Sequence, residues 1–393
     1  MLKRRFGKTG LDVSVLTFGA MRIPPEPGEH PEANRERAFA TLRRALDVGI
    51  NHIETARGYG ESENLIGAAL REGVIRREEF FLTTKIAPTS TADEFRAALD
   101  DSMHRMGVQV VDNLDIHGIN TPELLQRTLQ KDGSLTSVRK AVEEGIVGHV
   151  GFSTHAPLQV ILDAINTGEF ESVNLHYYTL NRRNRPAVEL AASKDMGVFI
   201  ISPTDKGGQL FNPPAKLVEL CAPYTPIGIN QRWLLSQPHV HTLSLGAARP
   251  HEFDAHLAMA QVDGPLTPQE EAIIARLDAQ LLGIGSTYCS FCHECLPCPE
   301  EVHIPEILRL RNLVKAFDMT DFGRFRYGLF ARKDPDTGAR IGGADHWFPG
   351  VQGDFCTNCG ECLPRCPLHL PIPQLLAETH EMLGGRAGKR LWE

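Results

Sequence analysis

The sequence predicts a TIM barrel, a closed ring of eight parallel strands that are each followed by a helix, joined to a smaller and mainly helical metal-binding domain. Three observations carry this prediction. Short β-branched runs alternate with longer segments of helical periodicity over residues 1–285. Eight such strand–helix units fit into about 250 residues, which is the number and length that close a barrel. Of the nine cysteines in the chain, all but Cys221 fall in the remaining residues, 286–393.

The predicted strands are short runs rich in β-branched and aromatic residues between turn-forming residues. They cover residues 13–19, 52–56, 80–86, 113–118, 149–154, 172–178, 198–203 and 241–246. Helices are expected at residues 35–48, 62–71, 92–106, 135–144, 157–167 and 185–194. Thr91 stands before the third of these, with acidic residues in the first turn, as an N-cap does. An open doubly wound sheet is the alternative, but no G-x-G-x-x-G motif follows the first strand.

Composition and charge exclude several classes of protein. The 393 residues are 42% hydrophobic and 23% charged, as in ordinary globular proteins. No apolar run approaches the ~20 residues that cross a bilayer, so we expect a soluble protein with no membrane partner. The net charge of −8 and the lack of a basic block give no reason to expect nucleic-acid binding. Lys3-Arg4-Arg5 precedes a polar, turn-rich segment, which predicts a surface hairpin in a cytoplasmic protein instead of a signal peptide.

Chemically reactive side chains cluster where predicted strands end, which is where TIM barrels carry their active sites. Tyr59, Lys85 and His117 each lie close to a strand terminus, and Glu54 lies in the second strand. A phenol normally loses its proton near pH ~10, and a neighbouring ammonium lowers that value, so the phenol can exchange a proton with a carbonyl oxygen. The acid would hold the lysine, and the histidine would orient the substrate oxygen. Taken singly, each residue is more often a packing or partnered side chain.

These residues, in this order, resemble the aldo/keto reductase family over residues 1–282. The resemblance extends to several further motifs: residues 7–14 (GKTGLDVS), the loop with Glu54, Tyr59, Gly60 and Glu63, residues 148–153 (GHVGFS), Asn181-Arg182 and Ser202-Pro203. It implies that Tyr59 is the proton donor, Lys85 its activator and His117 the orienting residue. Glu54 stands where the family has aspartate; it keeps the charge but is one methylene longer.

The resemblance also implies a nicotinamide cofactor bound without a Rossmann domain. Ser153 and Asn174 would hold the carboxamide, and Ser202 and the turn after it would meet the pyrophosphate. After the last strand, from Gly246 to Arg249, the amides at the start of a helix would hold the adenosine phosphate. Arg249 can supply the positive charge that a 2′-phosphate needs, whereas Glu252 would repel it. NADP(H) and NAD(H) both remain open.

The cysteine-rich end has two related runs, separated by 57 residues. The second is the C-x₂-C-x₂-C-x₃-C-P pattern of bacterial ferredoxins, and the first is one residue shorter before its last cysteine. In two-cluster proteins the last cysteine of each run ligates the other cluster. This rule assigns one 4Fe–4S cluster to Cys289, Cys292, Cys295 and Cys366, and the other to Cys298, Cys356, Cys359 and Cys362. Two all-thiolate zinc sites are the alternative.

A similar helix start follows each run, at residues 303–308 and 371–376, which favours a helical ferredoxin-like domain. The insert at residues 318–354 carries aromatics, Trp347 among them, that we expect to pack it onto the barrel or the clusters. Cys221 has no partner spacing and is expected to be a buried thiol.

The whole chain thus resembles the aldo/keto reductase subgroup with a C-terminal two-cluster ferredoxin domain. The expected function is NAD(P)H-linked oxidoreduction of a small carbonyl or alcohol, with clusters that exchange electrons with a ferredoxin-like or other carrier. Two alternatives stay open. The clusters could be structural or redox-sensing, or the barrel could be a non-catalytic nicotinamide-binding scaffold for electron transfer.

Overall fold

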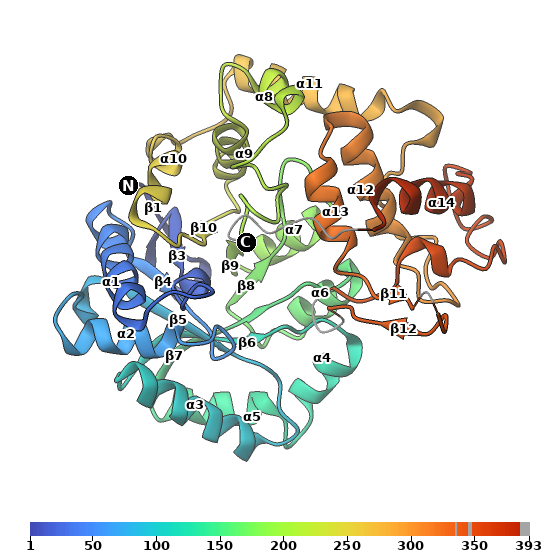
Figure 1. Ribbon diagram of the computed structural model, residues 1–393. Coiled ribbons are helices and arrows are strands. Elements are labelled where there is room, and N and C mark those ends of the chain that lie inside the picture. The colour runs from blue at the N-terminus through green and yellow to red at the C-terminus, as the bar shows by residue number, and fades with distance from the viewer. Residues whose placement is uncertain (335, 345–347, 386–393) are drawn as a thin grey trace. The chain divides into compact units, whose positions relative to one another are not determined.

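The computed structural model describes residues 1–334, 336–344 and 348–385. Within these residues, eight parallel strands close a barrel in the order β10-β3-β4-β5-β6-β7-β8-β9 (Figure 1). They are β3 (Leu16–Gly19), β4 (His52–Glu54), β5 (Phe81–Ile86), β6 (Val111–His117), β7 (Val147–Ser153), β8 (Ser172–Leu175), β9 (Gly197–Ile200) and β10 (Thr242–Leu245). The predicted barrel is therefore confirmed.

The N-terminal segment is a hairpin, as predicted. Strand β1 (Lys3–Arg5) pairs with β2 (Asp12–Ser14) in antiparallel register. Phe6 is buried against Phe199 and meets the His241 ring edge-on at 5.9 Å. A Cβ at Gly197, the first residue of β9, would lie 2.6 Å from the Phe6 ring. The hairpin can therefore pack on this end of the strand only because the residue is glycine. The prediction of one strand over residues 13–19 is wrong: the barrel strand begins only at Leu16.

Helices follow the strands of the barrel and bury one face each. They are α1 (Pro31–Asp47), α2 (Ser62–Arg71), α3 (Ala92–Met106), α4 (Pro122–Leu129), α5 (Ser134–Glu143), α6 (Leu158–Asn166), α7 (Arg185–Ser193) and the short α10 (Asp254–Leu257). The bounds of α2 and α3 match the prediction. Thr91 caps α3 by accepting from the Glu94 amide at 3.2 Å. Helix α2 packs closely against α3 at Gly67. A Cβ at this position would lie 2.2 Å from a carbonyl oxygen of α3, so a larger residue would clash there.

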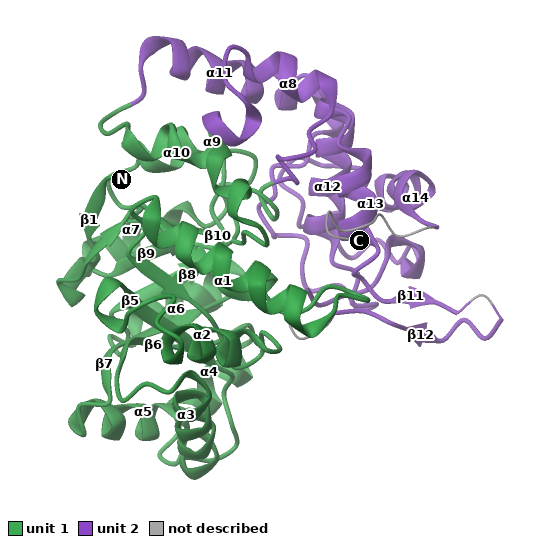
Figure 2. Ribbon diagram, turned by 60° about the vertical axis from the view of Figure 1, so that its left-hand side comes forward, with its two compact units in different colours: residues 1–207, 230–265 green, residues 208–229, 266–393 purple. Residues whose placement is uncertain are grey.

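The chain divides into two compact units (Figure 2). The first holds the barrel and comprises residues 1–207 and 230–265; the second comprises residues 208–229 and the described part of 266–393. The second unit contains α8 (Ala215–Cys221), α11 (Pro268–Leu282), α12 (Ile304–Phe317), α13 (Thr320–Tyr327), α14 (Ile372–Leu383) and the small sheet of β11 (Arg332–Lys333) and β12 (Arg340–Ile341). Helix α9 (Pro226–Leu235) begins in the second unit and ends in the first.

The unit boundary differs from the boundary at residue 285 that the sequence suggested. Helix α11, expected in the barrel domain, packs in the second unit, where Arg276 donates to the Leu220 and Ala222 carbonyls and Gln280 donates to the Ala316 carbonyl. The functional division into residues 1–285 and 286–393 stays a prediction.

The two cysteine runs have the same backbone form. Phe291 and Asn358 occupy equivalent places in the runs, and both have a positive φ, of 62° and 59°. Three residues after the last cysteine of each run, Glu301 and His369 also have a positive φ. Six residues after that cysteine, α12 and α14 begin. The predicted repeat of run and helix is therefore present.

The insert after α12 is more ordered than a loop. It contains α13 and the β11–β12 sheet, and it packs within its own unit through aromatic contacts. The Phe330 and Phe348 rings lie 4.5 Å apart, and the Tyr327 hydroxyl accepts from the Gly353 amide at 2.7 Å. Trp347 lies outside the described residues. Across the described part of the chain, no helix combines the length and apolarity that spanning a bilayer requires.

Candidate active site and thiol cavities

Three neighbouring strands line the barrel interior with polar side chains. Because side chains alternate along a strand, residues two apart share a face. The inner positions are His52 and Glu54 on β4, Thr83 and Lys85 on β5, and Asn113, Asp115 and His117 on β6. In the register of the sheet, Lys85 lies beside Asp115, which lies beside Gly151 of β7.

The four side chains that the sequence singled out as catalytic come together here. Lys85 forms an ion pair with Glu54 and donates to the Tyr59 hydroxyl at 3.3 Å. That hydroxyl donates to Glu54 Oε1 at 3.2 Å. The His117 ring meets the Tyr59 ring edge-on, with centroids 5.7 Å apart. One phenol, one ammonium, one carboxylate and one imidazole thus share a single site in the first unit.

The longer Glu54 is accommodated by its neighbours. Its second oxygen, Oε2, accepts from Ser244 Oγ on β10 at 2.7 Å. Gly19 of β3 lies beside Glu54 in the sheet, and a Cβ there would stand 2.6 Å from Ser244 Oγ and 3.1 Å from Glu54 Oε2. Glutamate therefore reaches Lys85 because the adjacent inner position is a glycine.

Burial governs the proton equilibria of the site. It raises the pKa of Tyr59 above its ordinary value, and the negative charge of Asp115 acts in the same direction. The net direction is therefore opposite to the lowering that the sequence predicted from Lys85, because burial and Asp115 outweigh it, and the neutral phenol is favoured. Burial also lowers the pKa of Lys85, which Asp115 opposes, and it lowers that of His52 to about 3, so His52 is a neutral imidazole.

Ser153 and Asn174, the residues expected to hold a carboxamide, lie side by side at the ends of β7 and β8. Ser153 Oγ accepts from the Gly118 amide at 3.1 Å. Asn174 is buried, and its Oδ1 has no hydrogen-bond partner among the described residues. An unpartnered buried acceptor is costly, and the amide N–H of a nicotinamide is a donor that fits it.

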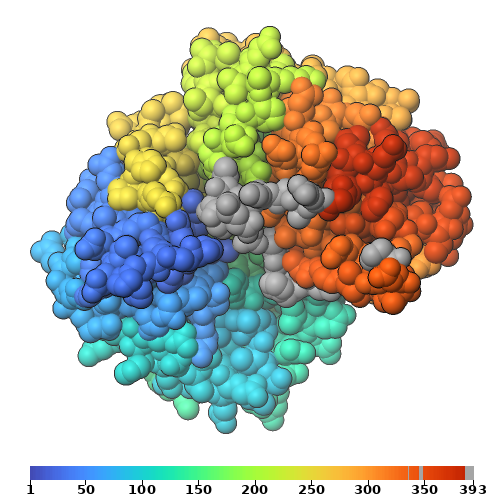
Figure 3. Space-filling view, viewed as in Figure 1, coloured from blue at the N-terminus to red at the C-terminus, as the bar shows by residue number. Residues whose placement is uncertain are grey.

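Ser202, expected inside a strand at residues 198–203, lies just beyond the end of β9 at Ile200, with a φ of 37°, and its carbonyl accepts from the Lys206 amide at 2.9 Å. Gly246 and Arg249 follow β10, and a 3₁₀ turn, η4 (Pro250–Phe253), comes next. In the space-filling view this region (yellow) lies against the blue part of the chain, and η4 contacts α1 there (Figure 3). The helix expected to offer free amides is a four-residue turn, and Glu252 already accepts from the Ala248 amide at 3.2 Å.

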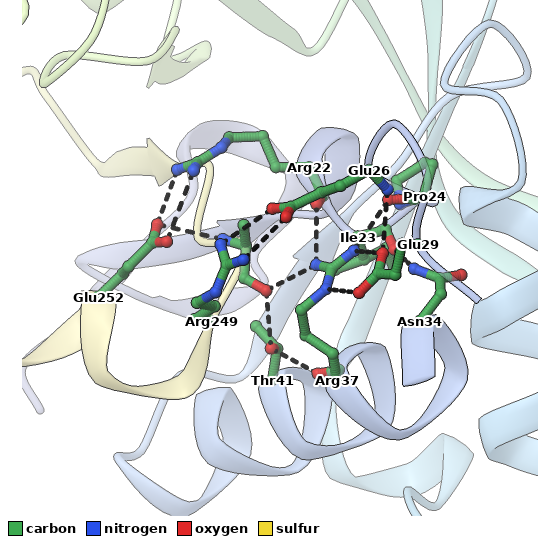
Figure 4. Close-up of polar contacts among 11 residues, drawn as sticks. Arg22, Ile23, Pro24, Glu26, Glu29, Asn34, Arg37, Thr41, Arg249 and Glu252 are labelled. Atoms are coloured by element: carbon green, nitrogen blue, oxygen red, sulfur yellow. Dashed lines mark hydrogen bonds and ion pairs between the residues drawn. The ribbon is translucent and has the colours of Figure 1, made fainter. Parts of the chain in front are cut away.

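The charges near Arg249 are paired (Figure 4). Arg249 donates to both oxygens of Glu26, at 2.9 and 2.8 Å. Glu252, which the sequence suggested would repel a phosphate, is bound by Arg22 at 2.7 Å. Arg37 of α1 holds the Glu26 loop by binding both oxygens of Glu29 and the carbonyls of Pro24 and Ala248.

In the second unit the eight cysteines of the two runs divide between two cavities. One is lined by Cys289, Cys292, Cys295 and Cys366. The other is lined by Cys298, Cys356, Cys359 and Cys362. These are the two sets that the crossing rule predicted. Cys221 lies apart, buried on α8, where burial raises its pKa to about 12.

Sequence reasoning missed Asp115, Ser244 and Glu26. Asp115 carried a signal, since it stands two residues before His117 on the same strand and must share its face. Ser244 and Glu26 carried none, because each meets its partner only after the barrel closes: 190 residues separate Ser244 from Glu54, and 223 separate Glu26 from Arg249.

The fold and site define the class of protein: a barrel with a buried tyrosine–lysine–carboxylate site, followed by an iron–sulfur domain. The family model "Aldo/keto reductase family" matches residues 15–213, and "4Fe-4S dicluster domain" matches residues 288–374. The chain belongs to the aldo/keto reductase family, with a 4Fe–4S dicluster domain towards its C-terminus.

Curated relatives match about half of this chain. L-galactose dehydrogenase of Arabidopsis thaliana is 28% identical over 216 residues, which are 52% of this chain and 66% of that protein. Pyridoxine 4-dehydrogenase of Escherichia coli is 24% identical over 57% of this chain and 82% of that protein. The solved holo form of an aldo-keto reductase from Bacillus halodurans has the same fold, with a TM-score of 0.59, 22% identity, and coverage of 70% of this chain and 96% of that chain.

Proposed function

We propose that the barrel catalyses NAD(P)H-linked reduction of a small carbonyl compound, or the reverse oxidation of an alcohol. The buried Lys85–Tyr59–Glu54 group at the carboxyl ends of the strands carries this proposal. A phenol that is neutral, buried and hydrogen-bonded to an ammonium is suited to giving a proton to a carbonyl oxygen. The dehydrogenase and reductase names of the relatives agree with this reaction class.

A nicotinamide cofactor held by Ser153 and Asn174 would supply the hydride for the carbonyl carbon. The Tyr59 proton, which points to Glu54 in the structure, passes to the carbonyl oxygen, and Lys85 at 3.3 Å stabilises the phenolate left behind. Glu54 keeps Lys85 in place, while Ser244 keeps Glu54 in place. His117, edge-on to the Tyr59 ring, orients the substrate oxygen.

The site for the cofactor would use the residues named above. Ser153 and the unpartnered Oδ1 of Asn174 would bind the carboxamide, and Ser202 and the residues after it would meet the pyrophosphate. Gly246 and Arg249 would lie at the adenosine end. The pairing of Arg249 with Glu26 supports a preference for NADH over NADPH, because the guanidinium is already engaged by a carboxylate.

Tyr59→Phe tests the reaction. It removes one hydroxyl, and loss of a general acid typically lowers turnover ~10²–10⁴-fold. The matched control is Tyr177→Phe, which removes a hydroxyl from a buried tyrosine that packs on Trp233 at 4.9 Å. Both variants are compared with the parent on a panel of aldehydes, ketones and alcohols. Equal turnover by the Tyr59→Phe variant and the parent would overturn the assignment.

We further propose that the second unit binds two 4Fe–4S clusters, one on each set of four cysteines. A cluster binds each thiolate to a different iron, so its ligands stand further apart than the four ligands of one zinc ion. Among the described residues, no three Cys, His, Asp or Glu side chains converge closely enough to hold a single ion, which supports the cluster. Anaerobically purified protein is expected to contain about eight iron and eight sulfide per chain. Zinc in place of iron would contradict this.

Exchange of electrons with an external carrier is the role we propose for the clusters. Each set has one exposed cysteine, Cys292 in one and Cys359 in the other, so both clusters would approach the surface. Rapid mixing of oxidised protein with NAD(P)H, substrate or a reduced ferredoxin, read at the cluster absorbance, tests it. If the clusters stay oxidised with every donor, the proposed electron exchange is wrong and a structural or sensing role is left.

A further inference from the structure

The buried group of ionisable side chains around Lys85 has two carboxyl groups for one amine. Glu54, Lys85 and Asp115 are exposed by only 3%, 1% and 2%. If all three are ionised, the interior holds two carboxylates and one ammonium. An uncompensated buried charge is costly, so such a site tends to bind a proton. The question is which carboxylate holds it.

Hydrogen bonding assigns the proton to Asp115. Glu54 accepts from Lys85, from Tyr59 and from Ser244, and these three donors all favour its charged form. Asp115 accepts from one donor that the structure records, Asn113 Nδ2 at 2.8 Å. Burial raises the pKa of Asp115, and Lys85 acts in the opposite direction.

Asp115 is built into the site by its neighbours. It lies beside Lys85 in the register of β5 and β6. On its other side, a Cβ at Gly151 would stand 2.2 Å from Asp115 Oδ1 and 2.2 Å from Ser172 Oγ, so the carboxyl fills the space that glycine leaves. Ser172 in turn donates to Asn113 Oδ1 at 3.3 Å, which orients the amide towards Asp115.

We propose that Asp115 is a positioning residue that acts through Lys85: it stores the proton that neutralises the buried group, and once ionised it keeps Lys85 charged beside Tyr59. This inference rests on the proposed carbonyl chemistry. The other titratable or charged groups around it are Glu54 and the neutral His52 on β4, Tyr59 after β4, His117 on its own strand, and Lys206, whose charge also acts on Lys85. Gly151 on β7 and Ser172 on β8 bring no charge.

Asp115→Asn tests the proposal, because it removes the charge and leaves an oxygen to accept from Asn113. Without the carboxylate, Lys85 loses its proton at lower pH, so the high-pH limb of the kcat profile is expected to move down by about 1–2 pH units. The control is Asp112→Asn on the same strand, where the carboxylate pairs with Arg77 instead. The control should leave the limb unmoved.

A second measurement needs no turnover and no variant. Infrared spectra of the parent protein, with and without ¹³C-labelled aspartate, should show the carbonyl band of a buried protonated aspartic acid that disappears as pH rises. The label separates it from Glu63, a buried glutamic acid whose pKa burial also raises. If no aspartate band titrates, or if Asp115→Asn lowers kcat equally at every pH, the proposal is wrong. If the band titrates but the protein reduces no carbonyl compound, the proposed function is wrong, whereas the protonation of Asp115 is still supported.

Discussion

Removing the charge of Glu26 should change the choice of cofactor. Arg249 holds Glu26 in a bidentate pair at 2.8 and 2.9 Å, so a 2′-phosphate must compete with this carboxylate for the guanidinium. Glu26→Gln removes the competitor but keeps the size of the side chain. The variant should therefore bind NADPH more tightly, while NADH, which has no 2′-phosphate, should be little affected.

The size of the effect follows from the exposure of the pair. The Arg249 side chain is 43% exposed and that of Glu26 is 27% exposed, so solvent screens their attraction. Partly exposed pairs are worth up to about 1 kcal/mol, which corresponds to about a fivefold change in Kd. Because salt screens such charges, the gain should shrink as ionic strength rises above ~0.1 M.

Fluorescence titration with NADPH, NADH and adenosine 2′,5′-bisphosphate measures the change directly, without a substrate. Glu32→Gln is the matched control, because it removes the same charge from the start of α1 at a side chain that is 89% exposed and whose recorded ion-pair partner is His30 instead of Arg249. Equal NADPH affinities for the parent and the Glu26→Gln variant, at low salt, would refute the reasoning.

Two further predictions concern the second unit. Cys366→Ser should abolish the cluster shared with Cys289 and leave the other, so iron content should fall by about half, whereas Cys221→Ser should leave it unchanged; loss of both clusters would contradict independent sites. Glu306→Gln should destabilise the unit by about 3–5 kcal/mol at pH 7. In the parent, Arg309 binds both Glu306 oxygens at 2.6 and 2.9 Å in a buried pair, and the substitution leaves the buried guanidinium without this carboxylate. Although burial opposes it, Arg309 holds the pKa of Glu306 below its ordinary value, so this stability is present above pH ~4.3 and is lost as pH falls further. Chemical unfolding measures it, and an unchanged midpoint would contradict the role of the pair.

The barrel could be predicted because its strands are continuous runs with a strong local signal. The bounds of α2 and α3 agree with the prediction: Thr91 caps the start of α3, whereas α2, whose N-cap residue Glu61 makes no side-chain cap hydrogen bond, is marked by its apolar face. Val13 and Ser14 were assigned to the barrel strand although they pair with β1 in the hairpin, because Val13 runs on into the apolar and β-branched residues from Val15 to Phe18. Helix α11 has a clear capping box at Thr267, yet its place in the second unit depends on contacts that no local pattern encodes.

The residues of the candidate active site were predictable by type, but their protonation states were not. The local pattern places four side chains at the carboxyl ends of strands, and therefore at the same end of the barrel: Glu54, Tyr59, Lys85 and His117. The direction of the Tyr59 pKa shift was not predictable, because it depends on burial and on Asp115, which lies 56 residues away in sequence. The two cysteine sets were predictable because the spacing within each run fixes the order of the ligands.

Two glycines connect these observations. Gly19 lies beside Glu54 and Gly151 lies beside Asp115, and in each case a Cβ would come within 3.1 Å of the carboxylate. A glycine inside a strand costs roughly 0.5–1 kcal/mol relative to alanine, because the unfolded chain has more freedom to lose. The barrel accepts that cost at the two inner positions where it gives buried carboxylates room. Both carboxylates then act on the same lysine, one as its ion-pair partner and the other as its neighbour in the sheet. An interior of larger apolar residues at these positions would be more stable, but it could not keep Lys85 charged beside Tyr59.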